Sequence, residues 1–184
     1  MEIPLPEATQ WEIIHEVAAV IQELLRQAAQ GEAVYDDDTS VPVPALRRES
    51  SDGRTGIFTS GIVSTADGRQ IALYFTGRHH AGENLATVLA HRAATLPPPI
   101  QMCDALARNL PKLPPAFATI VRYCLAHARR RFVNVTPAFP TECRYVLETS
   151  GAVCQVDAEA CEQRLSPEAR LQRHHTSSAP RLTV

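Results

Sequence analysis

With 184 residues, of which 45% are hydrophobic and 21% charged, the chain has the composition of one globular domain that can bury a core. The formal net charge of −2 excludes an overall basic protein. No apolar run approaches the ~20 residues that span a bilayer, and the first residues lack the pattern of a signal peptide. We therefore expect a cytoplasmic protein with no membrane segment.

The cysteines indicate a reduced setting. The chain has five of them, an odd number, and no two have the Cys-x-x-Cys spacing. Neither a disulfide framework nor a zinc knuckle is therefore expected. This agrees with an intracellular protein.

Charge is distributed unevenly along the chain. Residues 1–60 carry 11 acidic and 4 basic side chains, a balance of −7, whereas residues 61–184 carry 9 acidic and 14 basic ones, a balance of +5. The basic residues cluster at Arg122, Arg129, Arg130 and Arg131. Such a face can meet nucleic acid, and the alternative is an ordinary solvated helix face.

The first predicted element is an amphipathic helix that ends near Ala29. Thr9 and Glu12 form a capping-box pattern. Apolar residues then recur at three- and four-residue steps, and Gly31 is the stop signal. We expect the apolar face of this helix to pack on the core.

Strands are predicted next. A short strand is centred on Ala33–Asp37, and Pro42 and Pro44 confine the residues after it to an edge or a loop. Residues 47–55 are polar and are expected to form a surface loop. Two segments rich in β-branched and aromatic residues then flank a turn signal at residues 65–68 and predict a hairpin, Gly56–Ser64 with Arg69–Thr76.

A helix over Glu83–Ala94 comes after the hairpin and is ended by the prolines at 97–99. The loop before it contains His79 and His80. Adjacent histidines can bind a metal, but we favour solvated side chains here. A short apolar strand that ends at Asp104 is predicted next.

The last third of the chain is predicted to be mainly helical. Its predicted elements are a strand over Ala118–Tyr123 and helices from Cys124, over Pro137–Gly151, over Asp157–Leu165 and from Ser166. Ser166 is the expected N-cap, with a proline at the first helical position. From His174 onward no periodicity remains, so we expect a frayed tail.

Two carboxylates, Asp37 and Asp104, stand out in this order of elements. A strand with Asp37, a hairpin, a helix and a strand ending at Asp104 have the order of a ribonuclease-H-like α/β fold, with a mixed sheet, flanking helices and a helical C-terminal part. In that arrangement the two strands are neighbours, although 67 residues separate the two acids. The alternative is that Asp104 only caps the next helix and residues 36–38 form a solvated turn.

Oxygen ligands of this kind suit a divalent metal. Carboxylates together with a substrate phosphate can hold Mg²⁺. Two such ions about 3.5–4 Å apart can activate a nucleophile and stabilise the leaving oxygen of a phosphodiester.

Several stretches resemble the catalytic domain of bacterial DDE transposases of insertion-sequence family sixty-six, over roughly residues 4 to 173. They are Tyr35–Val41, Thr55–Thr65, Ile71–Leu85, Pro98–Asn109, Cys124–Phe132 and Phe139–Glu148. The resemblance implies a ribonuclease-H-like fold, DNA cleavage and strand transfer, and Mg²⁺ or Mn²⁺ as cofactor. It assigns Asp37 and Asp104 as the first and second catalytic, metal-binding acids.

A basic stretch also matches the family. Residues 124–132 fit its Cys-x-x-His-x-Arg-basic-basic-Phe pattern. DNA contact and support of the active site are both open as its role. We expect His127, Arg129, Arg130 and Arg131 to contact DNA.

The chain departs from the family in three ways. We expect it to lack the family's N-terminal oligomerisation and zinc-binding segments, and to stop before the third acid, a glutamate on a later helix. Residues 174–184 are expected to leave the family as a truncated or frame-shifted tail. Glu142 and Glu148 match the family's helical insertion instead, so the third acid stays unassigned.

These observations give a predicted organisation and three functional alternatives. Residues 1–31 would form a helix packing on the core, 32–133 the ribonuclease-H-like core, and 134–184 a helical insertion with the frayed tail. The chain would be a truncated transposase catalytic domain. Alternatively, it would be a non-catalytic fragment that binds DNA or intact transposase, or forms a homo-oligomer, or an α/β remnant without function.

Overall fold

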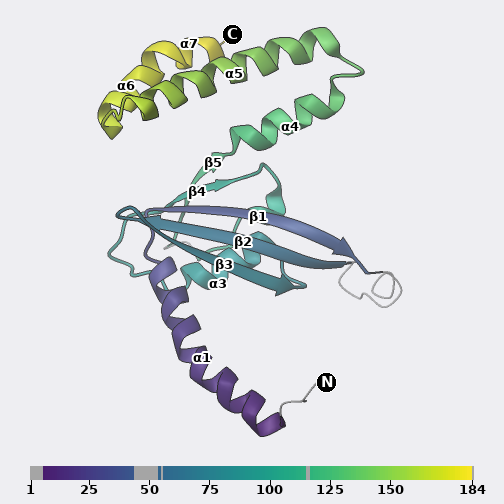
Figure 1. Ribbon diagram of the computed structural model, residues 1–184, viewed down its shortest axis with the longest axis vertical. Coiled ribbons are helices and arrows are strands. Elements are labelled where there is room, and N and C mark those ends of the chain that lie inside the picture. The colour runs from purple at the N-terminus through teal and green to yellow at the C-terminus, as the bar shows by residue number, and fades with distance from the viewer. Residues whose placement is uncertain (1–5, 44–53, 55, 115–116, 184) are drawn as a thin grey trace. The chain divides into compact units, whose positions relative to one another are not determined.

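The computed structural model describes residues 6–43, 54, 56–114 and 117–183 (Figure 1). It divides into two compact units, Met1–Tyr123 and Cys124–Val184. The predicted division at residues 31 and 133 remains a prediction. The elements of the first unit are α1 (Glu7–Ala28), β1 (Ala33–Pro42), β2 (Gly56–Ala66), β3 (Arg69–Gly77), α3 (Ala81–Leu89), β4 (Ile100–Cys103), the 3₁₀ helix η1 (Ala107–Asn109) and β5 (Ile120–Tyr123).

The first unit is built on a mixed five-stranded sheet with the order β3-β2-β1-β4-β5. The β1–β2 and β2–β3 pairs are antiparallel, whereas β1–β4 and β4–β5 are parallel. Helix α3 lies in the crossover between the antiparallel part and β4. The α/β, ribonuclease-H-like fold class expected from the order of elements is confirmed.

Strand β1 is longer than predicted. It pairs with β2 along its whole length, from Ala33↔Thr65 to Pro42↔Gly56. Its pairing with β4 ends at Tyr35↔Met102, so β1 becomes an edge beyond that point. Pro42 is tolerated because an edge strand has no neighbour on that side. Pro44 and, apart from Arg54, the predicted loop over residues 47–55 lie outside the described residues.

The hairpin forms as predicted. Asp67 and Gly68 occupy the turn with φ of 50° and 73°, the positive values that two-residue hairpin loops require. In β2, Phe58, Ser60 and Ile62 are buried, and the residues between them are more exposed. This alternation gives the strand one buried and one more exposed face.

The core of the first unit lies on that buried face. Helix α3 lies against β1 and β2 there (Figure 1). The buried cluster comprises Ala28, Ala29, Val34, Ile62, Leu85, Val88 and Leu89. The helix begins at Ala81, two residues before the predicted start, and ends at Leu89 rather than Ala94.

Helix α1 differs from its prediction at its start and on its apolar face. It begins at Glu7 after Pro6, and no side chain caps it, so the capping box at Thr9 is wrong. Its apolar side chains are exposed, from 72% at Trp11 to 39% at Leu24, and Ala28 is its only buried residue. Helical periodicity shows that a helix has an apolar face, but it does not show what covers that face. The expected packing on the core therefore holds only for the C-terminal end of α1.

The second unit is helical. It comprises α4 (Leu125–Val135), α5 (Pro140–Glu162), α6 (Pro167–Ser177) and α7 (Ala179–Leu182). The helices predicted over Pro137–Gly151 and Asp157–Leu165 merge into the single helix α5, because one internal glycine costs only about 1 kcal/mol. Ser166 caps α6 as predicted, accepting a hydrogen bond from the Ala169 amide at 3.3 Å.

The predicted frayed tail is helical. The His174 ring lies 2.9 Å from Asp157 Oδ1 through Nε2 and 2.9 Å from Ser178 Oγ through Nδ1. Ser178 is buried. Polar contacts such as these leave no periodic pattern of hydrophobic residues, so the sequence analysis did not predict this helix. Among the described residues, no helix is long and apolar enough to cross a membrane.

Candidate active site

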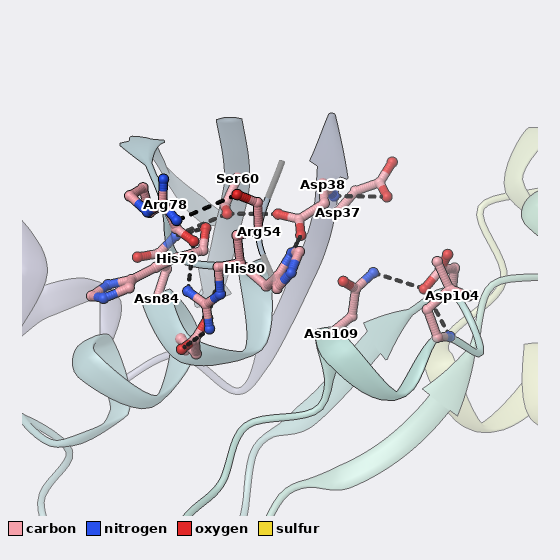
Figure 2. Close-up of polar contacts among 12 residues, drawn as sticks. Asp37, Asp38, Arg54, Ser60, Arg78, His79, His80, Asn84, Asp104 and Asn109 are labelled. Carbon is pink, nitrogen blue, oxygen red and sulfur yellow. Dashed lines mark hydrogen bonds and ion pairs between the residues drawn. The ribbon is translucent and has the colours of Figure 1, made fainter. Parts of the chain in front are cut away.

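Three consecutive carboxylates in the middle of β1 point to alternate faces of the sheet. Asp36 is 4% exposed and the Asp38 side chain 2%, both on the buried side, whereas Asp37 is exposed on the other side. Figure 2 shows the Asp38 carboxylate turned toward Ser60 and His80, and the Asp37 carboxylate turned away from them. The alternative of a solvated turn at residues 36–38 is therefore wrong.

The register of β1 and β4 bears on the predicted pair of acids. The three paired positions, from Ala33↔Ile100 to Tyr35↔Met102, each join residues 67 apart in sequence. Asp37 and Asp104 are also 67 apart, since 104 − 37 = 67, and Asp104 directly follows the last residue of β4. Extended by two residues beyond its last pair, this register would place Asp37 opposite Asp104. Their service as catalytic metal ligands remains a prediction.

Asp104 is held by amides rather than by a cation. Its Oδ1 accepts hydrogen bonds from the Leu106 backbone amide at 3.0 Å and from Asn109 Nδ2 at 2.7 Å (Figure 2). The side chain thus fastens the turn that leads into η1 but does not cap η1, whose N-cap residue is Leu106 and has no side-chain cap. Both bonds use Oδ1, and no hydrogen bond to Oδ2 is seen among the described residues.

Asp36 is a buried acid that sequence reasoning missed. Gln101 Nε2 donates to Asp36 Oδ1 at 2.9 Å and to the Asn109 carbonyl at 2.9 Å, while Asp36 Oδ2 is buried and has no hydrogen-bond partner among the described residues. Burial, opposed by the Gln101 hydrogen bond and reinforced by the negative charge of Asp104, raises the pKa of Asp36 to about 7. Only the alternation along β1 could have singled out this residue.

A second polar network surrounds Asp38. Ser60 Oγ donates to Asp38 Oδ1 at 2.7 Å, and Asn84 Nδ2 donates to Ser60 Oγ at 2.9 Å. The His80 ring lies 3.0 Å from Asp38 Oδ2 through Nδ1 and stacks at a tilt on Phe58, with ring centroids 4.0 Å apart. The predicted solvated state is therefore wrong for His80, because its ring binds a buried carboxylate. It is right for His79, which is exposed.

The donor set of Asp37 and Asp104 suits one class of metal. Among the described residues, no group of three or more His, Cys, Asp or Glu side chains could hold a metal ion. Two carboxylates are nevertheless what Mg²⁺ commonly takes from a protein, because it keeps several waters and binds substrate phosphates as well. The residues present therefore fit Mg²⁺ or Mn²⁺ bound together with a phosphate substrate.

The predicted basic stretch begins the second unit. Arg129, Arg130 and Arg131 are exposed on α4, a helix with no buried residue. Beside them, burial raises the pKa of the Cys124 thiol, but hydrogen bonds from His127 and the Ala126 amide outweigh burial and leave that pKa lowered. DNA contact by these side chains remains a prediction.

The comparison with known families decides the ancestry of the chain. Residues 6–183 match the family described as "Transposase IS66 family". The chain belongs to the IS66 transposase family. The match runs through residue 183, so the expectation that residues 174–184 leave the family is wrong. No curated protein and no solved structure matches the chain.

Membership in the IS66 family gives the chain a role related to transposition. Transposases act on DNA, and DDE transposases generally use divalent metals. The resemblance seen in short motifs thus agrees with a match over nearly the whole chain.

Proposed function

We propose that this IS66 family chain takes part in DNA cleavage and strand transfer through Mg²⁺ or Mn²⁺ bound at Asp37 and Asp104. The single observation that carries the proposal is the β1–β4 register, whose 67-residue offset relates Asp37 to Asp104. Asp37 in β1 and Asp104 directly after the neighbouring parallel strand β4 would offer carboxylate oxygens to a metal. A bound divalent metal would supply charge stabilisation of the phosphodiester during cleavage.

The surroundings of the two acids support this role. Asn109 and the Leu106 amide fix Asp104 through one oxygen, which orients the other. Asp37 lies on the exposed face of β1, where a DNA strand has access to it. The third acid of the family's triad is not assigned to any residue of this chain.

Mn²⁺ titration by calorimetry, with and without a DNA duplex, tests the site. Asp37→Asn and Asp104→Asn should each weaken Mn²⁺ binding at least tenfold, because a neutral amide is a poor metal ligand. Asp67→Asn is the matched control, since Asp67 is exposed in the β2–β3 turn. Unchanged Mn²⁺ affinity in both site variants would refute the proposal.

A nicking assay on supercoiled plasmid tests the chemistry separately. Metal-dependent nicking that disappears in Asp37→Asn and Asp104→Asn but persists in Asp67→Asn would support the catalytic role. Metal binding without nicking would show that the two acids of this chain bind metal without completing the reaction.

The exposed arginines of α4 favour a second candidate, a DNA- or transposase-binding fragment without chemistry. Three adjacent cations on a helix with no buried residue form a surface suited to phosphates. Replacing Arg129, Arg130 and Arg131 by Gln should then weaken duplex binding and reduce its salt dependence. Binding that is insensitive to Asp37→Asn and Asp104→Asn, and never accompanied by nicking, would select this candidate.

A further inference from the structure

A pocket of about 490 Å³ in the first unit lies between α3 and the η1 segment. Its size is within the range of sites that hold a small ligand or a nucleotide unit. The side chains that give it its chemical character are Arg54, His79, His80, Glu83, Arg108 and Lys112. None of these is among the acids proposed to bind metal.

Backbone packing brings the two walls of the pocket together. Gly82, at the start of α3, lies so close to η1 that a Cβ there would meet the Leu110 carbonyl oxygen at 2.5 Å and the Arg108 carbonyl oxygen at 2.7 Å. Because glycine has no side chain, the backbone of α3 can contact the backbone of η1, the segment that contains Arg108. The position of Arg108 follows from the fold rather than from a flexible loop.

The lining is basic, and its one acid is already paired. Among the described lining residues, three side chains are permanent cations and Glu83 is the only carboxylate. Arg54 donates to Glu83 Oε1 at 2.8 Å, and the His80 amide donates to Glu83 Oε2 at 2.9 Å. The Arg54 hydrogen bond lowers the pKa of Glu83, so that its negative charge is matched by Arg54.

Two cations remain to meet a ligand. Arg108 and Lys112 are exposed, and neither makes a hydrogen bond or ion pair within the described part of the chain. No Phe, Tyr or Trp ring lines the pocket among these residues, so a stacked base is disfavoured. The chemistry of the lining selects an anion of phosphate type.

The pocket shares His80 with the Asp38 network and is connected to the Asp104 network through the η1 segment. His80 lines the pocket and binds Asp38 (Figure 2). Arg108 directly precedes Asn109, which donates to Asp104. A phosphate held here would therefore be bound by the same segment that fixes the second acid.

We propose that this pocket binds a backbone phosphate of the DNA substrate through Arg108 and Lys112. The inference rests on the proposed function for its choice of DNA, because free phosphate and mononucleotides share the same anionic group. A DNA phosphate is favoured because Arg108 directly precedes Asn109, which holds Asp104, and because no Phe, Tyr or Trp ring among the described lining residues could stack on a single base.

Fluorescence anisotropy of a labelled duplex, measured across a salt series with the full chain, tests the proposal. Arg108→Gln and Lys112→Gln should each weaken binding roughly tenfold and reduce the slope of log K against log salt by about 1. Arg69→Gln removes the same charge from an exposed position at the start of β3 and is the matched control. Losses no larger than that of Arg69→Gln would overturn the proposal.

Calorimetry with inorganic phosphate and with a mononucleotide separates the possible sources of the anion. Both should bind far more weakly than the duplex. Tight binding of either one that disappears in Arg108→Gln would overturn the DNA assignment. Thermal melts of the variants should match the wild type, because both side chains are exposed.

The two proposals can fail independently. If Arg108→Gln leaves DNA binding intact while Asp104→Asn abolishes Mn²⁺ binding, the pocket assignment fails and the proposed function stands. If Asp37→Asn and Asp104→Asn change neither metal binding nor nicking while Arg108→Gln weakens DNA binding, the metal site fails and the phosphate pocket stands.

Discussion

The Asp38 carboxylate and the His80 ring meet at 3.0 Å, Oδ2 to Nδ1, and so join the middle of β1 to the residue that precedes α3. The Asp38 side chain is 2% exposed and that of His80 is 18% exposed. Ser60 completes the arrangement by donating to the other oxygen of Asp38. A buried carboxylate with both oxygens engaged fixes the geometry of this part of the sheet.

Removing the Asp38 carboxylate should therefore destabilise the fold. Asp38→Ala leaves the buried Ser60 hydroxyl and the His80 ring without their acceptor, at a cost of about 2–4 kcal/mol. Asp38→Asn keeps an acceptor for Ser60 and should cost about 1 kcal/mol. Urea denaturation followed by circular dichroism measures both. Equal losses in the two variants would show that the hydrogen bonds of Asp38 are not what stabilises this region.

Asp36 should make the stability of the protein depend on pH. Its pKa is about 7 in the folded state against an ordinary value of 3.8, so the folded state binds its proton more tightly than the unfolded state does. The free energy of unfolding should therefore fall as the pH rises from about 4 through 7. A shift of this size corresponds to a ceiling of roughly 4 kcal/mol.

Asp36→Asn removes the charge and tests this dependence. The variant should be more stable than the wild type at pH 8, by roughly 2–4 kcal/mol, and about equal to it near pH 4. Urea denaturation at pH 4, 6 and 8 gives the comparison, with Asp67→Asn as an exposed control. A constant difference between Asp36→Asn and the wild type at all three pH values would contradict the assignment.

The positions of the metal-binding candidates could be predicted because they depend on strand order and period. A strand, a hairpin, a helix and a strand suffice to make β1, which contains Asp37, and β4, which Asp104 follows, neighbours in one sheet. The same alternation contained Asp36 and Asp38, whose burial was not predicted. Three acids in a row resemble a polar turn until the pairing of β1 with β2 is known.

Other features depend on contacts that no local pattern records. His80 binds Asp38 across 42 residues, so its burial has no signal in its own neighbourhood. The apolar face of α1 has the same period as a buried helix, yet Trp11 is 72% exposed. His174 and Ser178 hold the last helices through polar contacts, which hydrophobic periodicity cannot reveal.

Arg92 should be a structural residue despite its charge. It is 8% exposed, and its Nη1 donates to the carbonyls of Ala29 and Gly31 at 2.7 and 2.8 Å, while Nη2 donates to the Pro97 carbonyl at 2.7 Å. These bonds tie the end of α1 to the segment that enters β4. Arg92→Met keeps the aliphatic stem and leaves three carbonyls unpaired, and we expect a loss of roughly 2–4 kcal/mol.

Chemical denaturation of Arg92→Met measures this loss, and Arg26→Met is the matched control. Arg26 is exposed and pairs with Glu23 only three residues away, so its replacement should cost much less than that of Arg92. Similar losses in the two variants would mean that water replaces the Arg92 hydrogen bonds without penalty.

Gly82 should tolerate no side chain. A Cβ at this position would meet two backbone carbonyl oxygens at 2.5 and 2.7 Å, those of Leu110 and Arg108, and backbone atoms cannot rotate away. Gly82→Ala should therefore push η1 away from α3 at a cost of about 1–3 kcal/mol or more. Thermal melting measures the loss, and Gly77→Ala is the control because a Cβ there meets nothing within 4 Å.

The same substitution should affect DNA binding if the phosphate pocket is real. Displacing η1 shifts the segment that carries Arg108 and Lys112 relative to α3, so Gly82→Ala should weaken duplex binding at temperatures where the variant is still folded. Gly77→Ala should bind as the wild type does. A folded Gly82→Ala protein with unchanged stability and DNA affinity would show that α3 and η1 do not need this close contact, and the positioning of Arg108 by the fold would be refuted.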